Sequence, residues 1–360
     1  MAGDRAPEPG LLDAVRRGDE DAFRLLIQPY RAAIHAHCYR MLSSLFDADD
    51  ALQETLLRAW RALPRFQGHE LLRPWLYRIA TNVCLNALAR RRRRGLPIEH
   101  GHPAGPNDEP GEQLAEPVWV EPYPDDAVGL EDGYASPEAR YEQREAVELA
   151  FIAALQHLSA SQRAVLLLRD VLGFSAKETA GTLDTTITSV NSALQRARRR
   201  VNEQMPARSQ QATLRSLGDE RVRAIVEGYL DAWERGDVDA LAAMLAKDAT
   251  FSMPPYPTWW RGREVIAAFA AVPIHRYLPT QANGQAANAA YRWDAQQGSY
   301  LAEALEVLTL EGTQVKQMTA FMMPAVFQRF GLPGELPGED PTARAQRGRA
   351  EYPDPGRSAP

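Results

Sequence analysis

Two serines that can cap helices, Ser159 and Ser175, mark the most strongly specified local structure in the sequence. Each is followed three residues later by a Gln or Glu, which is the spacing of a capping box at a helix N-terminus. Gly173 separates the two predicted helices, residues 184–187 are turn-forming, and a last helix is predicted to begin near Thr188. The stretch therefore predicts a helix-turn-helix, in which the second helix commonly lies in the major groove of DNA.

The last of these helices has two chemically different sides. Its inner stripe is predicted to be Val190, Leu194, Ala197 and Val201. Its outer side carries Thr188, Ser189, Asn191, Ser192, Gln195 and Arg196. Short polar side chains near the start of such a helix can reach base edges, and arginines at its end can meet phosphates. The pattern favours DNA binding, although a purely structural helix pair would show a similar one.

Charge is distributed unevenly along the 360 residues, whose formal net charge is −6. Five arginines in a row, 90–94, form a second basic cluster, while acidic residues concentrate in 107–145. The chain is therefore not expected to bind nucleic acid over its whole surface. Its two cysteines, Cys38 and Cys84, provide neither a disulfide framework nor a zinc set and fit a reducing cytoplasm. We expect no metal, no cofactor, no signal peptide and no membrane span.

Composition divides the chain into blocks. Two helical blocks are predicted, over residues 11–95 and 137–204, and an acidic linker rich in Pro and Gly joins them over 96–136. A domain of helices and strands is predicted over 219–333, followed by a flexible tail over 334–360.

Two amphipathic helices stand out in the first block. The first has a buried stripe through Leu52, Thr55, Leu56, Ala59, Trp60 and Leu63. The second begins near Pro74, and its exposed face is predicted to carry Tyr77, Arg78, Thr81, Asn82, Asn86 and Arg90.

Three segments occur in an order that resembles a known family. They are DADDALQETLLRAWRAL (47–63), RPWLYRIATNVCLNALARRRRR (73–94) and LSASQRAVLLLRDVLGFSAKETAGTLDTTITSVNSALQRARRR (158–200). They resemble regions 2 and 4 of the sigma-70 family, specifically its extracytoplasmic-function group. The resemblance implies that region 2 binds the RNA polymerase clamp and opens the −10 element, whereas region 4 binds the flap and reads the −35 element. The partners would be core RNA polymerase and promoter DNA, and the protein would be an initiation factor, not an enzyme.

The resemblance also implies roles for individual residues. The polymerase-binding set is Asp49, Asp50, Gln53, Glu54 and Arg58. The −10 set is Trp75, Tyr77, Arg78, Asn82, Asn86, Arg90 and Arg91. The −35 set is Ser175, Lys177, Thr188, Ser189, Asn191, Ser192, Gln195, Arg196 and Arg199. Many relatives carry Lys and Arg where Asn191 and Ala193 stand here, so the promoter preference is not carried over.

The linker contains an unusual stretch, PVWVEPYPDD (117–126), with Trp119 and Tyr123 among prolines and acids. It could thread near the polymerase active-site channel, as the family's linker does. It could equally dock on the C-terminal domain, or be a plain tether.

The C-terminal block begins with helices and shifts to period-two patterning from about residue 276, which predicts an α+β arrangement. Its segments WERGDVDALAAMLAKDATFSMPP, RGREVIAAF and TAFMMPAVFQRFGLP resemble the SnoaL-like (nuclear transport factor 2-like) cone fold. The predicted fold class is thus multidomain: all-α sigma regions 2 and 4, followed by an α+β cone. The resemblance implies a built-in regulator, and a cone could hold a small ligand.

Some SnoaL-like proteins are enzymes that use an Asp/His pair. The histidine of this block, His275, has no clear acidic partner in the sequence, although Asp231, Glu303 and Glu306 are candidates. Two alternatives remain: a SnoaL-type hydrolase or cyclase tethered to a DNA-binding module, and a helix-turn-helix repressor. The missing pair argues against the enzyme, and the region 2 segments argue against the repressor.

Overall fold

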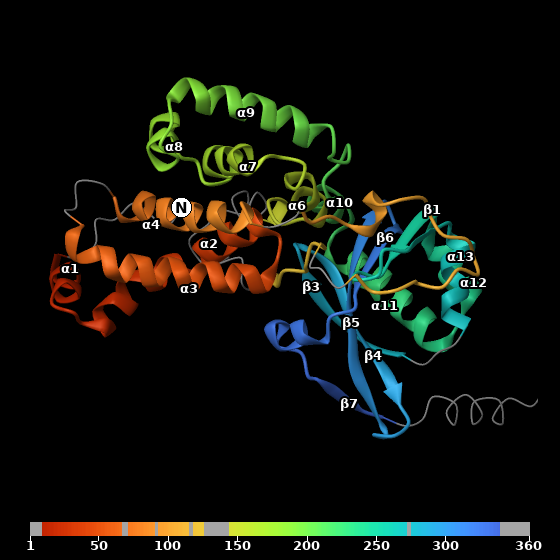
Figure 1. Ribbon diagram of the computed structural model, residues 1–360. Helices are drawn as coiled ribbons and strands as arrows, with labels where there is room; N and C mark the ends of the chain where they lie inside the picture. Colours follow the sequence, from red (N-terminus) through yellow and green to blue (C-terminus); the bar gives the residue numbers. More distant parts are fainter. Residues whose placement is uncertain are drawn as a thin grey trace, which may run out of the picture. The chain divides into compact units, whose positions relative to one another are not determined.

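The computed structural model describes residues 9–66, 71–90, 93–114, 118–125, 144–271 and 275–338. The chain forms two compact units (Figure 1). The first unit contains residues 1–96, 115–212 and 282–284, and the second contains residues 97–114, 213–281 and 285–360.

The first unit begins with a helical bundle formed by region 2. Its helices are α1 (Pro9–Arg16), α2 (Glu20–Leu42), α3 (Leu45–Ala62) and α4 (Leu72–Leu88). Asp19 caps α2 by accepting from the Ala22 amide, and Ser44 caps α3 by accepting from the Asp47 amide. Helices α2, α3 and α4 pack against one another, and the predicted stripe of α3 is buried or half-buried throughout.

Region 4 supplies further described helices of this unit. They are α6 (Leu149–Leu155), α7 (Ala160–Leu166), a π-helical turn (Leu167–Val171), α8 (Ala176–Thr182) and α9 (Ile187–Asn202). Helix α10 (Gln210–Leu217) follows region 4, and the boundary between the two units falls within it, after Ala212. Both predicted capping boxes are present, at Ser159 and Ser175. The predicted inner stripe of α9 is buried at all four positions.

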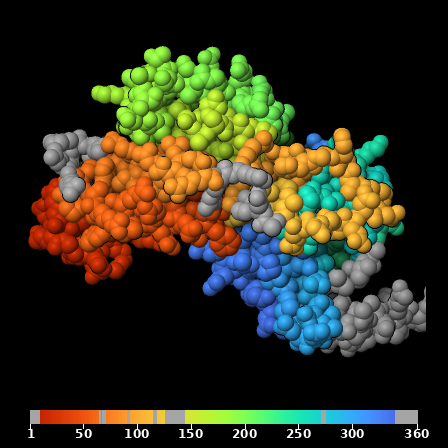
Figure 2. Space-filling model, in the orientation of Figure 1, coloured from red at the N-terminus to blue at the C-terminus, as the bar shows by residue number. Residues whose placement is uncertain are grey.

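Regions 2 and 4 pack directly on each other within this unit. Helices α7 and α8 lie against α4, and the space-filling view shows the two helical groups in close contact (Figure 2). The Arg40 side chain donates to the Ala146 carbonyl at 3.0 Å, and Arg73 donates to the Leu172 carbonyl at 3.0 Å.

The second unit is a helix-and-sheet domain. Its helices are α11 (Asp219–Arg235), α12 (Val238–Met244) and α13 (Arg263–Ala267). Its strands are β1 (Leu245–Ser252), β2 (Trp259–Arg261), β3 (His275–Ala282), β4 (Gln285–Asp294), β5 (Ser299–Glu311), β6 (Gln314–Phe321) and β7 (Glu335–Pro337).

The strand order is β2-β1-β6-β5-β4-β3, and β7 pairs with β5. Strands β5 and β6 form the predicted antiparallel hairpin, with Glu311 paired to Gln314 and Gly312 at positive φ in the turn. Side chains of α11, including Tyr229 and Trp233, share a core with residues of the sheet. The α+β prediction for this domain is confirmed.

The tail prediction needs a correction. Residues 335–337 form strand β7 against Leu301, Tyr300 and Ser299, because the extended segment after residue 334 meets the open side of β5. The rest of the predicted tail, from residue 339, lies outside the described residues.

Candidate nucleic-acid interface

Helix α9 presents a continuous polar face. Thr186 caps it by accepting from the Ser189 amide at 3.1 Å, which fixes the start of the helix. Every residue of the predicted −35 set is exposed: Ser175, Lys177, Thr188, Ser189, Asn191, Ser192, Gln195, Arg196 and Arg199. Because the opposite side is buried in the unit, this face is the one that α9 can offer to a groove.

A depression of about 380 Å³ adjoins this face, and it is lined by Arg169, Asn191, Leu194, Gln195 and Arg198. Arg198 makes two bonds to the Asp170 carboxylate, at 2.9 and 2.7 Å. One of the arginines in the cluster at the end of α9 is therefore already paired with a carboxylate of the protein, at the exposed surface. Sequence reasoning missed this pair because the partners are 28 residues apart.

The predicted polymerase face of α3 is mixed in character. Asp50, Gln53 and Arg58 are exposed, and Arg58 donates to Glu54 at 2.6 Å. Asp49 is half-buried, because its carboxylate lies 3.1 Å from the Nε2 atom of His35.

The residues of the −10 set differ in exposure. Asn82, Asn86 and Arg90 are exposed, as predicted, and Arg78 is half-buried. Arg91 lies outside the described residues. Trp75 and Tyr77 are buried, with 9% and 2% of their surfaces exposed.

The prediction of an exposed Tyr77 and Thr81 is wrong for this arrangement. Helix α4 has a second buried side, since α7 and α8 cover it. The Tyr77 ring meets His37 and Phe174 edge-on, at 5.3 and 5.5 Å between centroids. The Thr81 hydroxyl lies 2.9 Å from the Nε2 atom of His37. Burial lowers the pKa of His37 to about 3, so this ring is neutral at physiological pH.

The linker is not a plain tether. Its first half, residues 97–114, belongs to the second unit, where the Ala104 amide donates to the Trp259 carbonyl at 2.8 Å. Its second half, residues 118–125, is part of the first unit. The Tyr123 ring is fully buried there and stacks on Tyr39 at 4.1 Å between centroids.

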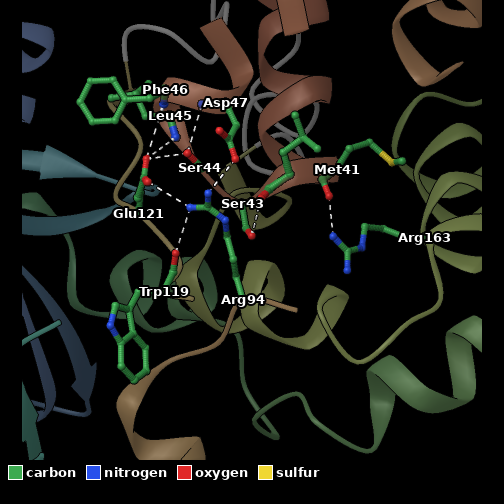
Figure 3. A network of polar contacts seen from close by, with 11 residues as sticks. Met41, Ser43, Ser44, Leu45, Phe46, Asp47, Arg94, Trp119, Glu121 and Arg163 are labelled. Carbon is green, nitrogen blue, oxygen red and sulfur yellow. Dashed lines mark hydrogen bonds and ion pairs between the residues drawn. The ribbon is translucent and has the colours of Figure 1, made fainter. Parts of the chain in front are cut away.

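Glu121 of this second half joins several groups of region 2 (Figure 3). One carboxylate oxygen accepts from the Ser44 hydroxyl and the Leu45 amide, at 2.8 and 2.9 Å. The other accepts from Arg94 at 3.0 Å, and Arg94 also donates to Asp47 at 2.7 Å. Arg94 is only 5% exposed, so this member of the arginine run does not lie on the surface.

Residues 282–284 also belong to the first unit, and Asn283 is a fully buried polar residue among them. Its side chain accepts from the Tyr123 amide at 2.9 Å and donates to the Tyr39 hydroxyl and the Val147 carbonyl, both at 2.8 Å. Sequence reasoning gave no role to Asn283. The Asn-Gly pair is a turn signal, but nothing in it indicates what the side chain contacts.

The second unit contains a His–carboxylate pair between His275 and Glu303, one of its three candidate partners. The His275 Nε2 atom lies 2.7 Å from Glu303, which also pairs with Arg292 at 2.7 Å. Burial alone would raise the pKa of Glu303, but His275 and Arg292 together hold it below its usual value. The expectation that His275 lacks an acidic partner is therefore wrong. The register of β4 and β5 has a bulge at Glu303.

A second carboxyl group in this unit, Glu306, is 5% exposed. It accepts from the Tyr229 hydroxyl at 3.0 Å and from the Asn288 amide at 3.3 Å. Burial raises the pKa of Glu306 to about 7, although these two donors and the nearby His275 act in the opposite direction. The Asn288 side-chain oxygen is buried and has no hydrogen-bond partner among the described residues.

Within the described ranges, no cluster of three or more His, Cys, Asp or Glu side chains could hold a metal ion. No described helix combines the length and the apolar character needed to cross a bilayer.

Family models match the chain in three places. They are sigma-70 region 2 over residues 26–94, sigma-70 region 4 over residues 142–201, and the SnoaL-like domain over residues 226–321.

Similar proteins agree with these matches. The chain is 42% identical over 330 residues to the ECF RNA polymerase sigma factor SigG of Mycobacterium tuberculosis, covering 89% of this chain and 86% of that protein. It is 30% identical over 198 residues to the RNA polymerase sigma-H factor of Pseudomonas aeruginosa, covering 54% of this chain and 91% of the relative. The crystal structure of the M. tuberculosis extracytoplasmic-function sigma factor SigJ shares the fold, with a TM-score of 0.53 at 18% identity, over 86% of this chain and 97% of that one. The chain belongs to the extracytoplasmic-function group of RNA polymerase sigma factors and carries a SnoaL-like domain after its regions 2 and 4.

Proposed function

We propose that this sigma factor recognises its promoters through the exposed face of α9 at the −35 element and that of α4 at the −10 element. The polar face of α9 carries the proposal. It offers hydroxyl and amide groups over its first turns and ends in Arg196 and Arg199. Amides and hydroxyls read base edges, and guanidinium groups bind phosphates.

On α4, Asn82 and Asn86 are the exposed groups that can bind unpaired bases. Arg90 is also exposed, two residues after the end of α4, and can bind the phosphate backbone of the DNA. Tyr77 would join them only after its contact with Phe174 of region 4 opens, whereas the Trp75 ring packs on Phe66 within region 2. The acidic face of α3, with Asp50 and Gln53 at its centre, is the proposed clamp contact, since a mixed polar surface suits a reversible protein interface.

RNA polymerase, the proposed partner, works in the cytoplasm. We therefore expect this protein to be cytoplasmic too, in line with its two free, buried cysteines.

Run-off transcription with core polymerase, on the DNA upstream of the protein's own gene, tests this function. The full chain is expected to direct initiation, and Arg196→Ala/Arg199→Ala to weaken it. Each lost phosphate contact should reduce the salt slope of DNA binding by about 0.9. Lys247→Ala, an exposed cation of the second unit, is the matched control and should leave both readouts unchanged. Absence of both run-off and co-purification with polymerase would return the repressor and enzyme alternatives to consideration.

The SnoaL-like domain is proposed to regulate initiation. The linker supports this, because its first half is held in the second unit and its second half in the first. We therefore expect a rearrangement of the domain to affect residues 118–125. A truncation ending at Gly218 should change run-off, and the direction of the change gives the sign of the regulation. Equal output from both forms would contradict a regulatory role.

The interior of this domain is also proposed to hold a small ligand. Glu306, Tyr229 and the unpartnered oxygen of Asn288 supply polar groups inside an apolar core. Such a combination is typical of small-molecule sites. A second candidate function is acid–base catalysis, which the His275–Glu303 pair favours.

The state of Glu306 is expected to make the stability of the second unit depend on pH. Its pKa is about 7 in the folded protein against an ordinary 4.5. The proton stabilises the fold fully below pH 4.5, and this stabilisation is lost as the pH rises through 7. The loss is on the order of 3 kcal/mol. Glu306→Gln should remove this pH dependence.

Hydrogen exchange of the β5 amides between pH 5 and 8 measures the effect in the second unit alone. This choice matters because burial also raises the pKa of Glu148, in the first unit, to about 7. Glu311→Gln, at an exposed position at the end of β5, is the control. An unchanged pH profile in Glu306→Gln would show that Glu306 is not the titrating group.

A further inference from the structure

The carboxylate of Glu121 occupies a site with several donors in region 2 (Figure 3). The Ser44 hydroxyl and the amides of Leu45 and Phe46 approach one oxygen, at 2.8, 2.9 and 3.5 Å. The Arg94 guanidinium approaches the other at 3.0 Å. The groups come from two parts of region 2, the start of α3 and the end of the arginine run.

These donors are of the kind that bind phosphate. Helix α3 has 18 residues, so the dipole at its N-terminus favours an anion. The nearly buried guanidinium adds a fixed positive charge and a planar set of N–H donors. Arg94 is itself oriented by Asp47 at 2.7 Å and by the Trp119 carbonyl at 3.2 Å.

Glu121 is not required as the cap of α3. Ser44 already caps the helix by accepting from the Asp47 amide at 3.1 Å. The carboxylate comes instead from the linker, 76 residues beyond Leu45 in the sequence. An anionic group from a separate segment therefore fills this anion site.

The charge balance allows an exchange of occupants. Asp47, Arg94 and Glu121 together carry one net negative charge. A phosphodiester also carries one negative charge, so it can replace the Glu121 carboxylate without changing the total. The position is also suitable, since Arg94 ends the run of arginines that follows α4, the helix assigned above to the −10 strand.

We propose that this site, formed by Ser44, the first amides of α3 and Arg94, binds a backbone phosphate of promoter DNA when residues 118–125 withdraw. Glu121 holds the same site in the free protein. The proposal rests on the promoter-binding function given above and adds a contact to it. It also gives the linker a defined chemical role, which is to compete with DNA for one anion site.

The test is the affinity of the full-length chain for a fluorescent 20-nucleotide oligo(dT) strand, measured by anisotropy across a range of KCl concentrations. Glu121→Gln should bind more tightly on the order of tenfold, since one charge-assisted contact is gained. Its salt slope should rise by about 0.7, the value for one more phosphate on a single strand. Glu121→Asp keeps the charge but shortens the side chain, and it should show a smaller gain in the same direction.

Two further variants separate the site from its surroundings. Glu20→Gln makes the same change of charge at an exposed position on α2 and should leave the affinity unchanged. Adding Arg94→Gln or Ser44→Ala to Glu121→Gln should return the affinity to the wild-type value. Circular dichroism establishes that each variant is folded.

Three outcomes would overturn the proposal. One is no gain in either Glu121 variant, and another is an equal gain in Glu20→Gln. The third is tighter binding to core polymerase without tighter binding to oligo(dT), which would assign the site to an acidic protein surface. Run-off by the wild-type chain is measured in parallel, so that a failure of the sigma function itself is recognised separately.

Discussion

Asn283→Ala is expected to destabilise the first unit by about 3 to 5 kcal/mol, because the substitution leaves buried polar groups without partners. The Tyr123 amide and the Val147 carbonyl each lose a bond of 2.8 to 2.9 Å, and the Tyr39 hydroxyl loses its donor. Asn283 also has a positive φ of 56°. Alanine tolerates this conformation less well than asparagine, which adds about 1 kcal/mol.

Hydrogen exchange of residues 118–125, together with urea unfolding, measures this loss. The linker segment should exchange much faster in Asn283→Ala than in the wild type. Asn283→Gly, which removes the same side chain but accepts the positive φ, should be less destabilised than the alanine variant by about 1 kcal/mol. Gln296→Ala removes an exposed amide from another turn and serves as the control. If residues 118–125 exchange as slowly in Asn283→Ala as in the wild type, the Asn283 side chain does not hold the linker.

The elements that depend on short-range signals could be predicted from the sequence. Ser159, Ser175 and the period of Val190 and Leu194 are sufficient for the helix-turn-helix, because capping and amphipathicity act within one or two turns. The turn at Gly312 and the strands on either side of it follow from similar local rules.

The features that were not predicted depend on residues far apart in the sequence. Tyr77 has the spacing of an exposed residue within α4, but its ring packs on His37 and on Phe174 of region 4, nearly a hundred residues later. Glu121 and Asn283 have the same character, since their partners are 27 to 244 residues away. The sequence shows that these side chains can form hydrogen bonds or pack as aromatic rings, but no local pattern specifies which distant residue each one contacts.

The packing of region 4 on region 2 has a consequence for promoter binding. By their names, the −10 and −35 elements are about 25 base pairs apart, which is about 85 Å of B-form DNA. A compact unit of about 200 residues has a radius of gyration of about 16 Å, or a diameter of roughly 45 Å. The two regions therefore cannot contact both elements of straight DNA while α4 stays packed on α7 and α8. They have to separate.

Linking the two regions covalently is accordingly expected to abolish run-off transcription. Arg93 and His157 are suitable positions, because their side chains meet at 2.9 Å across the two regions. The variant Arg93→Cys/His157→Cys would be treated with a short bis-maleimide that contains a cleavable disulfide. Run-off should fall to background after linking and return after reduction. The native Cys38 and Cys84 are buried, so they should not react.

A link within one helix distinguishes this effect from the modification itself. Asp13→Cys/Arg16→Cys places both thiols on α1, where the native side chains pair at 3.1 Å, and linking them should leave run-off unchanged. Full activity of the linked Arg93→Cys/His157→Cys protein would contradict separation of the regions. Both elements would then have to be read from one compact unit. Since that unit is about half as long as the spacing, the promoter would have to bend sharply around it, and such bending of a short duplex costs several kcal/mol.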